Sequence, residues 1–253
     1  MDFDLIIISG DSFAAGSGLI EQYMFETKTE RDKIPPLSYG YFLSEKMKIP
    51  LLNISIGGAS NEGIIRRSLS LLEKYEFYKP YDKLFNFDLS NYNKILFITQ
   101  WTFFHRFTFF FENEHKQIIP NKEAMLELNE FGDKANSFKK FLESKIDLEF
   151  DDFLCFDKFY YDYFLYNEFM KSKKNIFHYN LFLAERLPQN VLNKIETFKT
   201  NIISDRNISF QNIKTIDFET NGNIKDGHYG LKSCDILSDR IFEYLKKENY
   251  GLQ

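Results

Sequence analysis

The sequence predicts an α/β protein in which helices cover both faces of a parallel sheet. Two observations predict this class: short, nearly continuous apolar runs, and helical patterns between them. A run without polar alternation is typical of a strand that is buried on both faces. Strands that alternate with helices are typical of right-handed crossovers and therefore of a parallel sheet. We expect a three-layer α/β/α sandwich.

Five runs are rich in β-branched or other apolar residues, and we predict each of them to be a strand. They are Asp4–Ser9, Pro50–Ile56, Lys94–Thr99, Asn175–Tyr179 and Ile213–Phe218. Between and after them, apolar residues recur at helical intervals and predict helices over three segments. These are Tyr39–Met47, Ile64–Leu72 and Leu231–Leu245. At 253 residues, the chain fits one α/β domain with an insertion, which we assign to residues 1–253 as a whole.

Residues 103–173 interrupt the alternation and form the predicted insertion, between the third and fourth strands. No convincing strand pattern occurs in this segment, which holds much of the aromatic content. Within it, "FDKFYYDYFLYNEFM" has apolar residues almost all round a helix. We expect a helical, aromatic-rich segment that forms a cap over the site and sets the choice of substrate. The alternative is that it packs on the sheet edge or on another subunit.

Composition narrows the function classes. Hydrophobic residues make up 43% of the chain, enough to fill a core, and the formal charge of −5 with interspersed signs argues against a nucleic-acid partner. The 29 Phe and 15 Tyr fit either a general compositional bias, as an AT-rich genome gives, or an aromatic-lined pocket. The oligomeric state is left open.

The ends and the cysteines predict a cytoplasmic protein without a metal site. The chain begins Met-Asp-Phe-Asp, which is acidic where a signal peptide is basic, and the run Leu5–Ile8 is too short to span a bilayer. Cys155 and Cys234 have no metal-ligand spacing and allow only one disulfide, so free buried thiols are the default. No cofactor is expected.

Ser12 is the predicted nucleophile. It follows the first strand in "LIIISGDSFAAGSGL", and the carboxyl ends of parallel strands are where such folds bind ligands. A serine hydroxyl needs a nearby base and donors for the developing oxyanion. A turn from strand to helix exposes the hydroxyl and supplies backbone N–H groups beside it, while Ala14, Ala15 and Gly16 keep bulk away.

His228 is the predicted base among four histidines. It lies in "DGHYG", after the last predicted strand and just before the last helix, and Asp226 can accept from its Nδ1. His105 follows the third strand and is also a candidate. His178 lies in an apolar run and fits a core histidine, whereas His115 lies in a charged run.

"SGDS" after the first strand, "NISIGGASN" after the second and "DGHYG" before the last helix together resemble the SGNH/GDSL hydrolase superfamily. The resemblance implies a flavodoxin-like sheet of strand order 2-1-3-4-5. It also implies Ser12 as the nucleophile, with its own N–H and that of Gly58 in the oxyanion hole. Asp226 and His228 then complete a catalytic triad.

The chain departs from the family pattern at two places. The family acid usually lies three residues before the histidine, where this chain has Lys225, although some branches resemble the shorter Asp-x-His spacing. After the third strand the family usually has Gly-x-Asn-Asp, whose Asn completes the oxyanion hole, but this chain reads "ITQWTFFHR". Gln100 then falls at the Gly position and Thr102 at the Asn position. "GGASNEGIIRR" and "QWTxxxR" point to a divergent branch in which Asn61 or Arg106 assists.

The resulting hypothesis is a serine esterase that hydrolyses a small acyl ester through an acyl-enzyme. Acetyl on a carbohydrate is the substrate that the breadth of the family suggests. Three alternatives use the same fold: an O-acyltransferase, a lipid esterase that uses the aromatic insertion, and a non-catalytic binding module. The missing Asn favours the module, and Ser12, Asp226 and His228 oppose it.

Overall fold

The computed structural model of the protein describes residues 2–74, 87–103, 106–111, 114–118, 136, 139–140, 152–183, 189–204, 207–211, 213–216 and 226–250. Five strands form one parallel sheet in the order β2-β1-β3-β6-β7, which is 2-1-3-4-5 by position in the chain. They are β1 (Leu5–Ser9), β2 (Leu51–Asn53), β3 (Ile95–Gln100), β6 (Ile176–Leu181) and β7 (Ile202–Ile203). The predicted fold class and strand order are confirmed.

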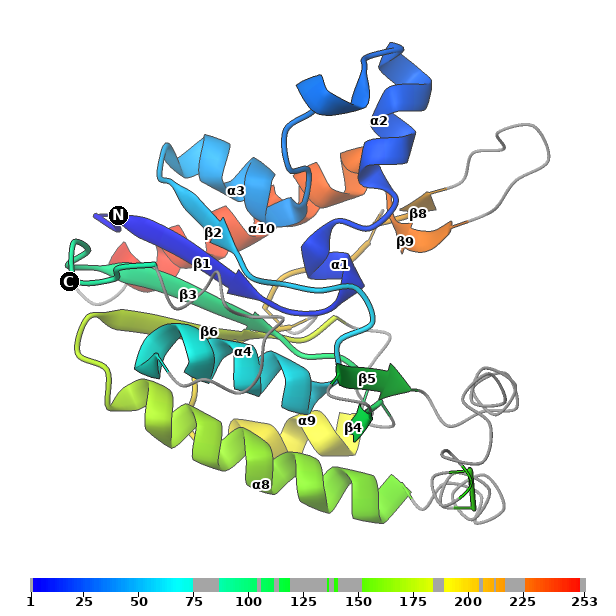
Figure 1. Ribbon diagram of the computed structural model, residues 1–253. Helices are drawn as coiled ribbons and strands as arrows, with labels where there is room; N and C mark the ends of the chain where they lie inside the picture. Colours follow the sequence, from blue (N-terminus) through cyan, green and yellow to red (C-terminus); the bar gives the residue numbers. More distant parts are fainter. Residues whose placement is uncertain are drawn as a thin grey trace.

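Helices cover both faces of the sheet (Figure 1). On one side lie α1 (Ser12–Ala15), α2 (Leu19–Thr27), the 3-10 turn η1 (Arg31–Lys33), α3 (Tyr39–Met47) and α10 (Leu231–Tyr250). On the other lie α4 (Asn61–Glu73), α8 (Asp152–Lys171) and α9 (Gln189–Glu196). The molecule is therefore a three-layer α/β/α sandwich.

Two apolar clusters, one on each face, hold the layers together. Successive side chains of a strand point to opposite faces, so Ile6 and Ile8 of β1 pack toward α3 and α10 in one cluster. Leu5 and Ile7 pack in the other cluster, which includes Tyr163 of α8. These four side chains of β1 are almost fully buried. This two-sided burial explains why the strand is apolar from Leu5 to Ile8.

The fifth strand is not the one that the sequence predicts. The run Ile213–Phe218 contains β8 (Thr215–Ile216), which pairs antiparallel with β9 (Asp226–Tyr229) outside the main sheet. The parallel fifth strand is instead β7, in which only two residues pair with β6. A two-residue strand has no periodicity to detect, whereas Ile213–Phe218 is a stronger apolar run, so the sequence prediction of the fifth strand is wrong.

The segment 103–173 differs from the expectation in one respect. Strands β4 (Phe107–Phe111) and β5 (Glu114–Ile118) form an antiparallel hairpin there, so the expectation of a segment without strands was wrong. The hairpin leaves β3 shortly after its carboxyl end. The predicted helix over "FDKFYYDYFLYNEFM" is present as part of α8, which lies along the sheet (Figure 1). Among the described residues, no helix is long and apolar enough to span a membrane.

Candidate active site

Ser12 opens the short helix α1 directly beyond the carboxyl end of β1. Gly10 allows this tight connection, because a Cβ there would lie 2.6 Å from the Cβ of Ala14 and 3.0 Å from that of Gln100. Gly16, in the left-handed region with φ 78°, ends the helix after four residues. The first N–H groups of a helix have no partner within it. Ser12 is 6% exposed and begins a helical turn whose first backbone N–H groups have no acceptor within the helix.

Asp11 is the centre of the polar network beneath this turn. Its side chain is fully buried and caps α1 by accepting from the N–H of Phe13 at 3.0 Å. Oδ1 also accepts from Nε2 of Gln100, and Oδ2 accepts from Oγ1 of Thr102, both at 2.7 Å. Charge-assisted bonds of this length are among the stronger ones. One carboxylate thus ties the end of β1 to the end of β3.

Arg106 approaches the same carboxylate from the segment before the hairpin. Its Nη1 lies 3.4 Å from Oδ2 of Asp11 and 3.2 Å from Oγ1 of Thr102. The guanidinium lies over the ring of Phe103, with its carbon 5.3 Å from the ring centre, and the side chain is 12% exposed. A cation therefore balances the buried charge of Asp11 at the edge of the site.

Asn61 joins the start of α4 to the backbone after β3. Ser60 caps α4, and its side chain accepts from the N–H of Gly63. The Asn61 amide then accepts from the N–H of Thr102 at 2.9 Å and donates to the carbonyl of Thr102 at 3.3 Å. Asn61 is 7% exposed. The sequence-predicted residues Asn61, Gln100, Thr102 and Arg106 therefore belong to one hydrogen-bonded cluster with Asp11.

The loop after β2 brings two exposed glycines to the same end of the sheet. A Cβ on Gly57 would lie 4.0 Å from the Cβ of Ser12, so this loop borders the predicted nucleophile. Gly58 has φ 75°, a conformation that favours glycine, and no atom lies within 4 Å of the position of its missing Cβ. The space in front of Gly58 is therefore open.

His228 lies on β9 and packs against α1. The centre of its ring is 4.8 Å from that of Phe13, the residue after Ser12, and the ring of Tyr229 meets Phe13 edge-on at 4.9 Å. The structure thus brings His228 beside the helix that Ser12 begins. Asp226 opens β9 and pairs with Ile216, while its side chain and residues 217–225 lie outside the described part of the chain. An Asp226–His228 pair stays a prediction.

Of the other histidines and the two cysteines, the structure describes the side chains of His178 and Cys234. His178 is half-buried on β6 and bonds to Oγ1 of Thr99 through Nε2 at 2.9 Å, and burial lowers its pKa to about 3, so the prediction of a histidine with a satisfied structural role is confirmed. His105 and the side chains of His115 and Cys155 lie outside the described residues. Cys234 is a free, buried thiol whose pKa burial raises to about 12.

Sequence reasoning missed Asp11 as a part of the site. Its signal was present, since an acid directly after a buried strand has no apolar role. Its importance depends on donors that lie two positions away, at Phe13, and about 90 positions away, at Gln100, Thr102 and Arg106. Burial raises the pKa of Tyr39 well above its ordinary value, and the negative charge of Asp11 adds to this effect.

The chain is similar in structure to several esterases. The match with the psychrotrophic esterase EstA from Pseudoalteromonas sp. covers 98% of this chain and 99% of the esterase, with 13% identity and a TM-score of 0.43. The match with an acetyl xylan esterase, Est2A, from Butyrivibrio proteoclasticus covers 98% of this chain and 64% of that enzyme, with 14% identity and a TM-score of 0.48. A GDSL-like lipase from Bacteroides thetaiotaomicron matches with 9% identity and a TM-score of 0.37, over 97% of this chain and 89% of the lipase. No protein-family model and no curated protein matches the sequence.

Proposed function

We propose that the protein is a serine ester hydrolase that works by two-step acyl transfer. The observation that carries this proposal is the position of Ser12, which starts α1 at the carboxyl end of β1 while the ring of His228 packs on the adjacent Phe13. A nucleophile and a base on separate elements, brought to one end of a parallel sheet, is the arrangement that this chemistry needs.

In the first step, His228 takes the proton of the Ser12 hydroxyl while Oγ attacks the carbonyl carbon of the ester. The tetrahedral intermediate then expels the alcohol, which receives that proton from His228, and an acyl-Ser12 ester is left. In the second step, His228 takes a proton from water as the water oxygen attacks the acyl carbon; the bond to Ser12 Oγ then breaks, and His228 returns the proton to Oγ, which releases the acid and restores the Ser12 hydroxyl. We assign to Asp226 the role of holding the His228 ring by accepting from Nδ1.

The oxyanion needs donors that replace the missing family Asn. We propose the N–H groups of Ser12 and Gly58 and, as a third donor, Nδ2 of Asn61. Gln100 is fully buried and donates to Asp11, and the single hydroxyl hydrogen of Thr102 is also donated to Asp11. Asn61 Nδ2 carries two hydrogens, and one of them goes to the Thr102 carbonyl. Arg106, at the edge of the cluster, supports substrate binding by its charge.

The substrate that we propose is a small acyl ester, such as acetyl on a carbohydrate, as the resemblance implies. The open space at Gly58, in the loop that borders Ser12, supports a compact acyl group. An acyltransferase uses the same first step, with a sugar hydroxyl in place of water in the second. Analysis of the products with an added sugar acceptor separates the two reactions.

The test is covalent labelling of the purified protein by a fluorescent alkyl phosphonate. Wild type should be labelled, and Ser12→Ala should not, because the phosphorus bonds to the activated serine oxygen. The matched control is Ser17→Ala, which removes a hydroxyl in the turn after the same helix and should leave labelling intact. Labelling that survives Ser12→Ala would move the nucleophile elsewhere. Absence of labelling in a folded wild type would favour a binding module.

A further inference from the structure

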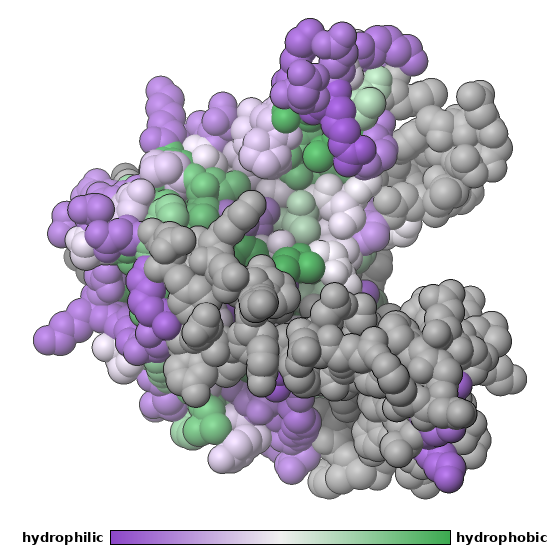
Figure 2. Space-filling view, in the orientation of Figure 1, coloured by the Kyte–Doolittle hydropathy of each residue, from purple (hydrophilic) through white to green (hydrophobic). Residues whose placement is uncertain are grey.

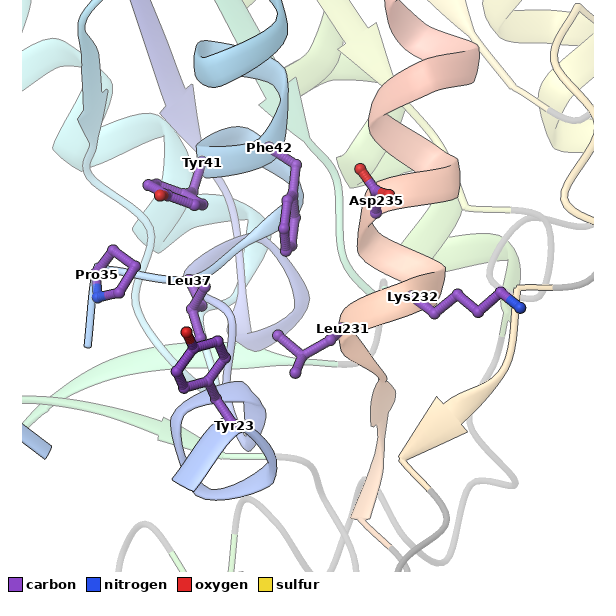
Figure 3. A pocket seen from close by; sticks show the side chains of 8 residues that line it. All are labelled: Tyr23, Pro35, Leu37, Tyr41, Phe42, Leu231, Lys232 and Asp235. Carbon is purple, nitrogen blue, oxygen red and sulfur yellow. The ribbon is translucent and has the colours of Figure 1, made fainter. Parts of the chain in front are cut away.

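A pocket of about 440 Å³ lies between α2, α3 and the start of α10 (Figure 3). Three rings line it, Tyr23 from α2 and Tyr41 and Phe42 from α3, and Leu37 and Leu231 add apolar surface. Hydrophobic residues gather on this side, below the hydrophilic tip of α2 (Figure 2). The volume lies in the range of pockets that bind small ligands.

The pocket also holds polar groups with unused hydrogen-bonding capacity. The hydroxyls of Tyr23 and Tyr41 bond to no residue in the described part of the chain. Burial raises the pKa of Tyr41, and the nearby Glu45 and Tyr23 add to this effect. At the rim, Asp235 accepts from Lys46 through Oδ1, and the Asp235 side chain is 48% exposed. Lys232 points away from the rings (Figure 3).

The walls of the pocket continue into the elements that carry the candidate active site. Leu231 lies three residues after His228, and its N–H donates to the side chain of Gln22 at 2.8 Å. Gly16, which ends α1, lies so close to the loop before α3 that a Cβ on it would approach the Leu37 carbonyl to 1.9 Å. The pocket is therefore lined by elements that adjoin α1, which carries Ser12, and β9, which carries His228.

We propose that this pocket binds a sugar ring of an oligosaccharide ester, at a distance from the bond that is cleaved; the role in catalysis rests on the proposed function. The apolar face of a sugar packs on aromatic rings, and its hydroxyls pair with phenol and carboxylate groups. An alkyl chain would bury the two phenol hydroxyls against hydrocarbon without partners, which is costly. The mixture of three rings with two phenols and one carboxylate therefore selects a neutral sugar.

The experiment compares a substrate too small to reach the pocket with one that fills it. The substrates are p-nitrophenyl acetate and acetylated xylotetraose, each with wild type, Tyr23→Ala, Tyr23→Phe and Tyr161→Ala. Tyr161 is 65% exposed on α8, across the sheet, and serves as the matched control. Tyr23→Ala should raise KM for the oligosaccharide about tenfold with little change in kcat, because one ring contact is lost. Tyr23→Phe should have a smaller effect, and p-nitrophenyl acetate should be hydrolysed equally by all four proteins.

A binding measurement separates failure of this proposal from failure of the proposed function. Ser12→Ala protein is titrated with unmodified xylotetraose and cellotetraose by calorimetry. The titration is repeated with two double variants, in which Ser12→Ala is combined with Tyr23→Ala or with Tyr161→Ala. Binding that only Tyr23→Ala weakens supports the sugar pocket, even if no ester is hydrolysed. Absence of binding to both sugars overturns the proposal. A change in preference between acetyl and octanoyl esters in the Tyr23→Ala enzyme also overturns it, because the pocket would then be an acyl site.

Discussion

At the scale of single residues, Asp11 organises the candidate site through the hydrogen bonds that it accepts. Its fully buried carboxylate receives hydrogen bonds from α1, from the end of β3 and from Arg106. A buried charge is tolerated only when it is paired and hydrogen-bonded. Gln100 and Thr102 meet this requirement; because Gln100 is also fully buried and the one hydroxyl hydrogen of Thr102 is used, neither is the oxyanion donor that we propose.

Asn61 is the residue on which the proposed oxyanion hole can be tested. Asn61→Asp keeps the oxygen that accepts from Thr102 but replaces the Nδ2 donor with a second oxygen. We expect kcat for p-nitrophenyl acetate to fall by about 10²–10³, the usual effect of losing one oxyanion donor, with a small change in KM.

The control for this test is Asn201→Asp, since Nδ2 of Asn201 also donates to a backbone carbonyl, that of His178 at 2.9 Å. It should cost some stability and leave kcat unchanged. Equal losses of kcat in the two variants would mean that Asn61 acts only through folding.

At the scale of elements, α8 shows how one aromatic-rich helix divides its rings between core and surface. Phe159, Tyr163, Tyr166 and Met170 are buried at helical spacing, and the first three surround Trp101. Tyr161, Phe164 and Leu165 are exposed on the other side. This helix is therefore part of a sandwich layer. A cap formed by the rest of 103–173 stays a prediction, since much of that segment lies outside the described residues.

Two substitutions on α8 test this division. Phe159→Ala should lower the free energy of unfolding by about 3–5 kcal/mol, because it removes a ring packed edge-on against Trp101. Tyr161→Ala on the same helix should change it by at most about 0.5 kcal/mol. Urea denaturation followed by circular dichroism measures both. Similar losses in the two variants would show that the buried and exposed sides are wrongly assigned.

At the scale of the whole molecule, His178 links the stability of the sandwich to pH. It lies on β6 in the central sheet, between the rings of Phe97 and Tyr166, which meet it edge-on. Among the described residues it contacts a hydroxyl and two neutral rings, and none of these is an anion that would stabilise the protonated imidazole. Burial lowers its pKa to about 3 in the folded protein, against about 6.5 in the unfolded chain.

Acid should therefore destabilise the fold through this residue. Between about pH 6.5 and 3, the His178 imidazole is protonated in the unfolded chain but not in the folded protein. The free energy of unfolding therefore keeps its full value above pH 6.5 and decreases as the pH falls below it. Within that window the contribution is about 1.4 kcal/mol per pH unit. His178→Gln should lose less unfolding free energy than wild type between pH 6.5 and 4.5 in urea titrations. Parallel pH profiles would contradict the buried, neutral imidazole.

The sequence alone determined the layers of this protein. Strands β1, β2, β3 and β6 and helices α3, α4 and α10 lie where apolar runs and helical periodicity predict them, because those signals are local. The order of the sheet is confirmed with them. The positions of Ser12 and His228 at one end of the sheet also follow from local turn residues. Ser12 follows a Gly and an Asp after a strand, and His228 lies between two Gly residues before a helix.

Only the tertiary structure decided which short segments pair and which polar groups meet. β7 joins the sheet through two residues, and β8 pairs with β9 instead, because strand pairing depends on neighbours far along the chain. Asp11 finds Gln100 and Thr102 about 90 positions away. The pocket likewise needs α2, α3 and α10 to pack together before its rings converge. Such contacts are set by packing between elements, and no pattern within one element encodes them.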